Sequence, residues 1–325
     1  MKIAFVGKGG SGKTTLTSLL VSHLASTGRP LLAVDADINQ HLATALGATE
    51  QEAQEWPTLG AQLPSIKEYL RGSNPRIASA DEMLKTTPAG RGSRLVGVAD
   101  DNPVWRECVR EVRGVRLAVT GPFTEDDLGV ACYHSKTGAV ELLLNHLVDG
   151  PGEYVVVDMT AGADAFASGL FTRFDVTFLV CEPTLRSVGV YRQYVDHAKD
   201  FGVQIVVIGN KIGDDEDLAF LRDQVGDDLF AWIGRSGYVR AAERGEVRPI
   251  DALEPEHREV LGRMTELADG TPKDWPRYQR QAADFHRRNA VAWGNGKAGV
   301  DLTTQIDPDF VPGPVSPTGG ALAFA

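Results

Sequence analysis

Short runs of apolar residues alternate with longer amphipathic stretches along most of the chain. Seven of the short runs are apolar almost throughout, which is typical of parallel strands that helices cover on both faces. These predicted strands are Ile3–Val6, Leu31–Val34, Val115–Val119, Tyr154–Val157, Val176–Val180, Ile205–Ile208 and Leu229–Ile233. The alternation predicts an α/β fold whose mostly parallel, doubly wound sheet carries helices on both faces.

Three amphipathic regions predict helices. The first region follows the Ile3 strand, carries a leucine at positions 16, 19, 20 and 24, and ends near Gly28. That spacing places the four leucines on one helix face. A second helix is predicted over Gly138–Leu147, before the Tyr154 strand. Helical patterns return between Pro255 and Ala292 and predict a helical C-terminal extension over about 251–294.

Two parts of the chain depart from the alternation. Between about 49 and 114, prolines and glycines separate short helical pieces, which indicates an insertion into a main domain that spans residues 1–250. Residues 295–325 are rich in proline and glycine. We expect this tail to be extended and poorly packed by itself, and it is a candidate arm for partner binding.

Composition and charge narrow the functional classes. The 325 residues are 42% hydrophobic and 24% charged, which is enough apolar material for a large core. A net charge of −11 argues against a nucleic-acid partner and against a polybasic membrane anchor. No apolar run approaches the roughly 20 residues that cross a bilayer, so no membrane insertion is expected. Three cysteines do not make a disulfide framework, and we expect a cytoplasmic protein.

Residues 7–14, GKGGSGKT, match the phosphate-loop pattern G-x-x-x-x-G-K-[ST] directly after a strand and at the start of a helix. Glycines let the backbone N–H groups wrap phosphates, and the helix N-terminus adds its positive dipole end. Lys13 should reach the β- and γ-phosphates, while the Thr14 hydroxyl should ligate Mg²⁺. The motif makes residues 1–250 a P-loop NTPase domain. Its expected nucleotide contacts are Gly9, Gly10, Ser11, Gly12, Lys13, Thr14 and Thr15.

Residues 8–14, KGGSGKT, resemble the deviant Walker A motif of the SIMIBI class of P-loop ATPases, which includes MinD, ParA and the nitrogenase iron protein. In that class the early lysine reaches across a homodimer to the nucleotide of the partner subunit. The resemblance therefore implies a homodimer that forms on ATP binding, with Lys8 as a catalytic group beside Lys13. The alternative is that Lys8 is an ordinary exposed lysine in a loop.

Two further segments resemble the switch regions of the same class. Residues 34–39, VDADIN, are similar to switch I, which implies that Asp37 orients the attacking water and that Asp35 lies in the outer shell of Mg²⁺. A helix-capping role without metal is the alternative for this pair. Residues 155–162, VVVDMTAG, look like the Walker B and switch II segment. By that resemblance Asp158 holds a magnesium-bound water and the Gly162 backbone contacts the γ-phosphate.

Residues 208–213, IGNKIG, are the candidate base-binding segment. A GTPase would carry Asn-Lys-x-Asp, with the acid accepting hydrogen bonds from guanine, but the fourth residue here is Gly213. We therefore favour ATP, with Asn210 bonding to the adenine, as the resemblance implies. Asp214, one residue later, keeps GTP open as an alternative.

Residues 158–162, 181–184 (CEPT) and 210–211 (NK) look most like the CooC group, the accessory ATPases of nickel insertion into carbon monoxide dehydrogenase. CooC carries a Cys-x-Cys pair with which its dimer binds metal. Here the matching residues are Cys132 and His134. Across a two-fold axis they would form an S₂N₂ site suited to Zn²⁺ or tolerant of Ni²⁺. The alternative is a buried Cys132 and a surface His134 without metal.

These features lead to one expected function and one alternative. The expected function is an ATP-dependent homodimeric switch that slowly hydrolyses Mg-ATP to drive maturation or assembly of an unidentified client protein, with metal insertion as one form. The alternative is a regulatory or positioning ATPase of MinD/ParA type that recruits partners through its insertion and tail. Other branches of the class fit less well. A MinD-like protein would be expected to end in a basic amphipathic helix and a ParA-like protein to show a basic patch, and neither feature is evident in this sequence. A protein-targeting ATPase would be expected to be rich in methionine, and this chain has only four methionines.

Overall fold

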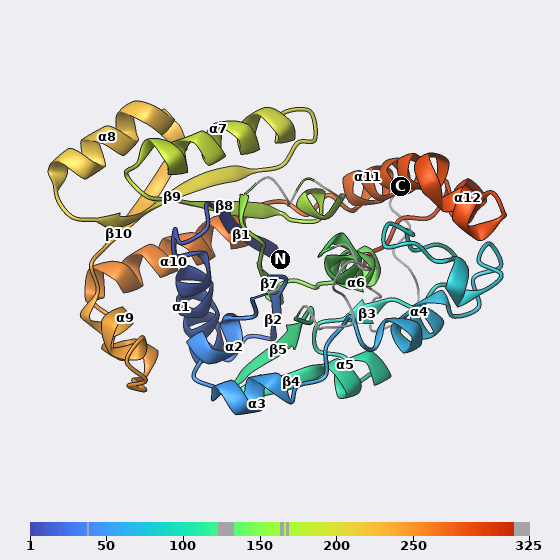
Figure 1. Ribbon diagram of the computed structural model, residues 1–325, viewed down its shortest axis with the longest axis horizontal. Coiled ribbons are helices and arrows are strands. Elements are labelled where there is room, and N and C mark those ends of the chain that lie inside the picture. Colours follow the sequence, from blue (N-terminus) through green and yellow to red (C-terminus); the bar gives the residue numbers. More distant parts are fainter. Residues whose placement is uncertain (38, 123–132, 163–165, 167–168, 315–325) are drawn as a thin grey trace.

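An eight-stranded sheet forms the centre of the computed structural model, which describes residues 1–37, 39–122, 133–162, 166 and 169–314 (Figure 1). The strand order is β10-β9-β8-β1-β7-β2-β5-β4, and the pairs are parallel except for β4 with β5. The strands are β1 (Lys2–Gly7), β2 (Leu31–Asp35), β4 (Val109–Val112), β5 (Val115–Val119), β7 (Tyr154–Asp158), β8 (Val176–Cys181), β9 (Ile205–Ile212) and β10 (Leu229–Gly234). Two short strands, β3 (Val96–Gly97) and β6 (Leu147–Val148), pair separately.

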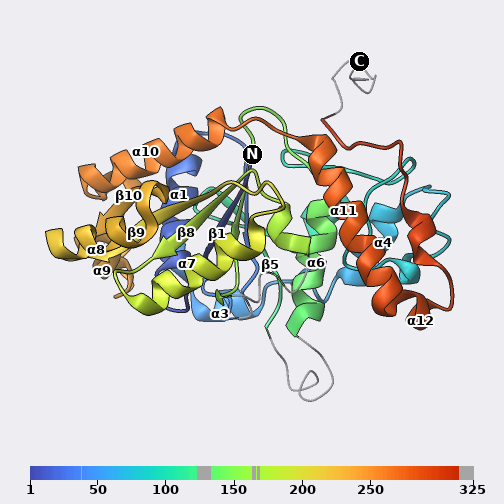
Figure 2. The same ribbon diagram turned by 90° about the horizontal axis from the view of Figure 1, so that it is seen from above.

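Helices cover both faces of this sheet (Figure 2). On one face α1 and α10 bury side chains such as Leu20 and Leu261 against the strands. On the other face α6 and α7 bury side chains such as Leu143 and Tyr194. The helices are α1 (Lys13–Ser26), α2 (Leu42–Ala45), α3 (Glu50–Gln54), α4 (Leu63–Arg71), α5 (Pro103–Cys108), α6 (Tyr133–His146), α7 (Leu185–Ala198), α8 (Asp215–Val225), α9 (Gly237–Ala242), α10 (Pro255–Gly270), α11 (Trp275–Asn289) and α12 (Asn295–Ala298).

The predicted fold class is confirmed, and each of the seven predicted strands is present. The four leucines of the first helix are buried in α1, as their spacing indicated. Among the differences from the prediction, one strand extends further than expected and an edge strand was missed. β9 continues to Ile212, so that Asn210 and Lys211 lie within the strand. β4 was missed because its two middle residues are exposed and charged, as suits the edge of a sheet.

The order of the strands positions the functional site. β1 lies between β7 and β8, and the chain leaves β1 through α1 toward one half of the sheet and leaves β8 through α7 toward the other half. In open α/β sheets, ligands bind at such a switch point, outside the carboxyl ends of the strands. The phosphate loop follows β1 at this point.

The C-terminal segment differs from the poorly packed tail that we expected. Residues 302–307 fold back onto residues 82–91, and Leu302, Gln305 and Asp307 are at most 2% exposed. Asp307 accepts hydrogen bonds from the Arg91 guanidinium at 3.0 and 3.1 Å and from the Arg91 backbone N–H at 3.2 Å. Proline and glycine content alone did not reveal these buried polar anchors. Residues 315–325 lie outside the described part of the chain.

Asp307→Ala should lower the free energy of unfolding by about 2 kcal/mol, because it removes a buried carboxylate that accepts three hydrogen bonds from Arg91 and one from the Asp309 backbone N–H. Urea unfolding of the full chain measures the change. Asp309→Ala is the matched control, since Asp309 is 74% exposed and contacts Arg91 at 3.5 Å. That control should stay within about 0.5 kcal/mol of the parent protein. Equal losses in both variants would contradict a structural role for Asp307.

Candidate functional site

The loop between β1 and α1 adopts a conformation that only glycine accepts at two of its positions. Gly7 has φ +145° and Gly12 has φ +98°. A Cβ atom on Gly7 would lie 2.5 Å from the Val180 carbonyl oxygen, and one on Gly12 would lie 2.1 Å from Asn210 Nδ2. The neighbouring strands β8 and β9 therefore approach the loop too closely for any side chain. This close packing fixes the loop over the carboxyl end of the sheet.

Lys13 is a cation held close to the loop. Lys13 is the first residue of α1 and is only 6% exposed. Its Nζ donates to the Lys8 carbonyl oxygen at 3.4 Å. Burial lowers the pKa of Lys13, while the carboxylates of Asp158 and Asp37 oppose that change. A desolvated ammonium group with few hydrogen bonds is well suited to bind a phosphate oxygen.

Oxygen donors converge beside this lysine. Thr14 Oγ1 donates to Asp158 Oδ2 at 2.6 Å, and Thr17 Oγ1 lies 3.4 Å from Asp158 Oδ1. Asp158 is buried at the end of β7, and burial raises its pKa whereas the hydrogen bond from Thr14 lowers it. A threonine hydroxyl and a carboxylate are hard oxygen ligands of the kind that Mg²⁺ prefers.

The two acids of the predicted switch I differ in their surroundings. Asp35 is fully buried opposite Asp158 in the sheet, and its carboxylate accepts the backbone N–H groups of Asp37 at 3.1 Å and Leu42 at 2.9 Å. Burial raises the pKa of Asp35, and the Asp158 carboxylate adds to that effect. Asp35 therefore shapes the backbone of this segment. Asp37 is partly exposed, accepts from Asn39, and lines the cavity described below.

The base-binding candidates contact the phosphate loop itself. Asn210 Nδ2 donates to the Ser11 carbonyl oxygen at 2.7 Å, and Lys211 Nζ donates to the Gly10 carbonyl oxygen at 2.7 Å. Asp214 instead caps α8, where its Oδ1 accepts the backbone N–H groups of Glu216 and Asp217. Asp214, the acid on which the GTP alternative depended, thus uses one carboxylate oxygen to cap a helix N-terminus.

Sequence reasoning missed two site residues, Glu182 and Lys211. Glu182 Oε1 lies 2.7 Å from Lys211 Nζ, and its Oε2 lies 3.5 Å from Lys8 Nζ. Glu182 stood in a segment noted only as a family signature, and Lys211 stood in the candidate base-binding segment without a role of its own. The available signal was that both segments follow or end parallel strands, whose carboxyl ends meet at the ligand-binding edge of such a sheet.

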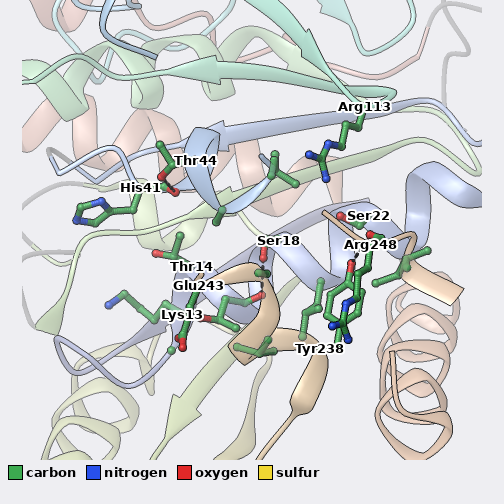
Figure 3. A pocket seen from close by; sticks show the side chains of 18 of the residues that line it. Lys13, Thr14, Ser18, Ser22, His41, Thr44, Arg113, Tyr238, Glu243 and Arg248 are labelled. Atoms are coloured by element: carbon green, nitrogen blue, oxygen red, sulfur yellow. Dashed lines mark hydrogen bonds between the residues drawn. The ribbon is translucent and has the colours of Figure 1, made fainter. Parts of the chain in front are cut away.

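A cavity of about 980 Å³ opens beside the loop and follows α1 (Figure 3). Lys13 and Thr14 lie at one end, Ser18 and Ser22 follow along α1, and Tyr238 and Arg248 lie near the other end. Of the expected contacts, Gly9, Gly10, Gly12, Lys13, Thr14 and Thr15 line it, whereas Ser11 is buried. Gly162, with φ +73°, follows the cavity-lining Ala161. The volume is at the upper end of the usual range for small-molecule sites.

The predicted transition-metal site gains no support. Cys132 lies outside the described residues, and His134 lies in the first turn of α6, where only the backbone is described. Within the described ranges no group of three or more His, Cys, Asp or Glu residues could hold a metal ion. Cys108 and Cys181 are buried free thiols. Across the same part of the chain, no helix has the length and apolarity that a membrane span needs.

A glycine-rich phosphate loop at the switch point of a parallel sheet, with a buried lysine and a Thr–Asp pair, defines a P-loop nucleotide-binding protein. Residues 3–270 match the CobQ/CobB/MinD/ParA nucleotide binding domain, and the chain belongs to this family. The resemblance inferred from the deviant Walker A motif is thereby confirmed. Members of this family are nucleotide-binding ATPases.

Individual relatives agree with this assignment. The carbon monoxide dehydrogenase accessory protein CooC of Rhodospirillum rubrum is 31% identical over 253 residues, covering 77% of this chain and 90% of CooC. The cell division ATPase MinD of Pyrococcus furiosus has the same fold, with a TM-score of 0.53 at 18% identity over 82% of this chain and 99% of MinD. MinD of Pyrococcus horikoshii, solved with Mg-ADP, gives 0.51 at 17% identity over 89% and 97%.

Proposed function

We propose that this chain is an ATPase that works as a homodimeric switch, closing on Mg-ATP and reopening after slow hydrolysis. The observation that carries the proposal is the buried Lys13 ammonium beside the Thr14–Asp158 pair, at the mouth of a cavity large enough for a nucleotide. A cation and hard oxygen ligands side by side match the two needs of a triphosphate with its metal ion.

The predicted residues of the nucleotide site each have a role in this proposal. Thr14 would ligate Mg²⁺ and Asp158 would hold a magnesium-bound water, the metal ion would neutralise phosphate charge, and Asp35 keeps the switch I backbone in place behind them. Lys13 binds the β- and γ-phosphates, and the backbone N–H groups of residues 9–15 wrap the phosphate chain. Asp37 orients the attacking water and Gly162 contacts the γ-phosphate. These assignments rest on the resemblance together with the positions of the side chains.

ATP is the proposed nucleotide. The position at which a GTPase carries its guanine-binding acid is Gly213, whose N–H donates to Asp217 Oδ2 at 2.8 Å. The neighbouring Asp214 is engaged as the cap of α8. In this proposal the side-chain amide of Asn210 hydrogen-bonds to adenine. Its Nδ2 then either keeps its present hydrogen bond to the Ser11 carbonyl oxygen or exchanges that bond for one to the base.

Dimerisation through the loop face has support from two exposed groups. The Lys8 side chain is 33% exposed at the carboxyl edge of the sheet, and its contact Glu182 stands three residues before Leu185, which is 70% exposed. An exposed leucine at the start of α7, close in sequence to a charged loop contact, suits an interface that a second copy of the chain covers.

Lys8→Ala should leave the affinity for Mg-ATP within about threefold and remove ATP-induced dimerisation, because the proposed contact of Lys8 is with the nucleotide of the partner subunit. Calorimetry measures the affinity and light scattering measures the mass in solution. Lys199→Ala is the control, since Lys199 is 61% exposed and pairs only with Asp196 on α7 in the described structure. A dimer that persists in Lys8→Ala would remove Lys8 from the switch.

Maturation or assembly of a client protein is the proposed output. The similarity to the carbon monoxide dehydrogenase accessory protein over most of both chains supports it. The MinD structures lie below 20% identity and support the fold alone, so a positioning role has no separate support. We propose no transition-metal site at Cys132 and His134, because no group of three or more His, Cys, Asp or Glu residues in the described part of the chain supports one.

A further inference from the structure

Two lysines beside the phosphate loop share one carboxylate. Lys211 Nζ lies 2.7 Å from Glu182 Oε1, and Lys8 Nζ lies 3.5 Å from Glu182 Oε2. The three residues come from different parts of the chain, namely the loop after β1, the end of β8 and the end of β9. The Glu182 side chain is 15% exposed, whereas those of Lys8 and Lys211 are 33% and 55% exposed. A single acid thus neutralises one of two positive charges that border an anion-binding loop.

Glu182 is held rigidly in this position. Its backbone N–H donates to Ser187 Oγ at 3.0 Å, and its carbonyl oxygen accepts the Thr184 N–H at 2.7 Å. Lys211 has φ +62°, a left-handed conformation that is unfavourable for a residue with a Cβ atom. Backbone strain of this kind concentrates at functional sites, and here it accompanies an ammonium group placed over the loop.

Each lysine also has an anchor that does not depend on Glu182. Lys8 Nζ donates to the Gly9 carbonyl oxygen at 3.0 Å, and Lys211 Nζ donates to the Gly10 carbonyl oxygen at 2.7 Å. The loop backbone can therefore keep both ammonium groups beside the loop, and Lys211 also lines the cavity. What Glu182 adds is negative charge, which competes with any phosphate that approaches the same two cations.

We propose that Glu182 is the resident counter-ion of the phosphate loop, a carboxylate that pairs with Lys8 and Lys211 and gives up Lys211 to the phosphate oxygens of the nucleotide in its own subunit and Lys8 to those of the nucleotide in the partner subunit. The proposal rests on the nucleotide site described above and adds two residues to it. Lys211 becomes a phosphate-binding lysine alongside Lys13. Glu182 lowers the affinity of the site for the nucleotide and thereby favours its release.

Glu182→Gln should tighten the binding of Mg-ATP by about fivefold, because the amide keeps the shape of the side chain but not its charge. This factor corresponds to the upper end of the usual contribution of a partly exposed ion pair. Calorimetry on the full chain measures the dissociation constant. Asp196→Asn is the matched control, because it removes the same charge from an ion pair on α7 that is 67% exposed at the acid. That control should leave the constant within about 1.5-fold.

The double variant Lys8→Met with Lys211→Met lacks both lysines. It shows whether the gain in Mg-ATP affinity caused by Glu182→Gln depends on them. There the further change Glu182→Gln should alter the dissociation constant by less than about 1.5-fold. Weaker binding in the single variant, or an equal gain in the two backgrounds, would overturn the proposal. A parent protein that does not bind Mg-ATP at all would instead refute the proposed function, and the counter-ion role with it.

Discussion

Lys13→Ala is expected to remove Mg-ATP binding, lowering the affinity at least about 100-fold. Lys13 is 6% exposed, and without its ammonium group a phosphate oxygen at this buried position would be left without its counter-charge. Stability should change little, because burial already lowers the pKa of this group and its hydrogen bond to the Lys8 carbonyl oxygen is long. Binding and folding therefore separate in this variant.

Calorimetry with Mg-ATP and urea unfolding of the same preparation measure the two quantities. Lys199→Ala removes an equal charge from an exposed ion pair on α7 and should change neither. Tight nucleotide binding by the Lys13 variant would mean that the cavity beside α1 is not the nucleotide site. Lost binding together with lost stability would mean that Lys13 supports the fold and not the ligand.

Gly12→Ala is expected to have the largest effect on stability, at about 3 kcal/mol. The new Cβ atom would lie 2.1 Å from Asn210 Nδ2, and the residue would keep a φ of +98°. Asn210 cannot move away freely, because it is 7% exposed and donates to the Ser11 carbonyl oxygen. Nucleotide binding should fall with stability, since the loop between Gly7 and Lys13 must shift.

Two comparisons separate the causes in this variant. Gly28 has φ +71°, but no atom lies within 4 Å of the position that a Cβ atom would take there, so Gly28→Ala reports the backbone strain alone, about 1 kcal/mol. Adding Asn210→Ala to Gly12→Ala removes the close contact and should recover part of the loss. Urea unfolding measures all four proteins. Equal losses at positions 12 and 28 would show that the close approach of β9 has no energetic consequence.

The sheet was predictable because its central strands β1, β2, β7 and β8 are buried along their whole length and are therefore mostly apolar. β4 was not predictable in this way, since edge position allows Arg110 and Glu111 to face solvent. The C-terminal segment escaped prediction for a related reason. It is held by polar anchors such as Asp307 and Gln305, and a hydrophobic pattern does not report them.

The candidate site divides along similar lines. The phosphate loop is continuous in sequence, so its spacing alone indicated Lys13 and Thr14. The contact of Glu182 with Lys8 and Lys211 joins residues that are far apart in the chain, and only the order of β1, β8 and β9 in the sheet brings them together. Asp35 differs, because only the structure shows that its carboxylate accepts backbone N–H groups from Asp37 and Leu42 in the segment predicted as switch I.

The pairing of Arg91 with Asp307 has a consequence for the order of folding. The two residues are 216 positions apart, so during synthesis the earlier segment waits for its partner for roughly 10 to 40 s at translation rates of about 5 to 20 residues per second. The phosphate loop and its strands do not depend on that contact. The strands and loop that carry the nucleotide site are therefore synthesised before Asp307, the partner of Arg91, becomes available.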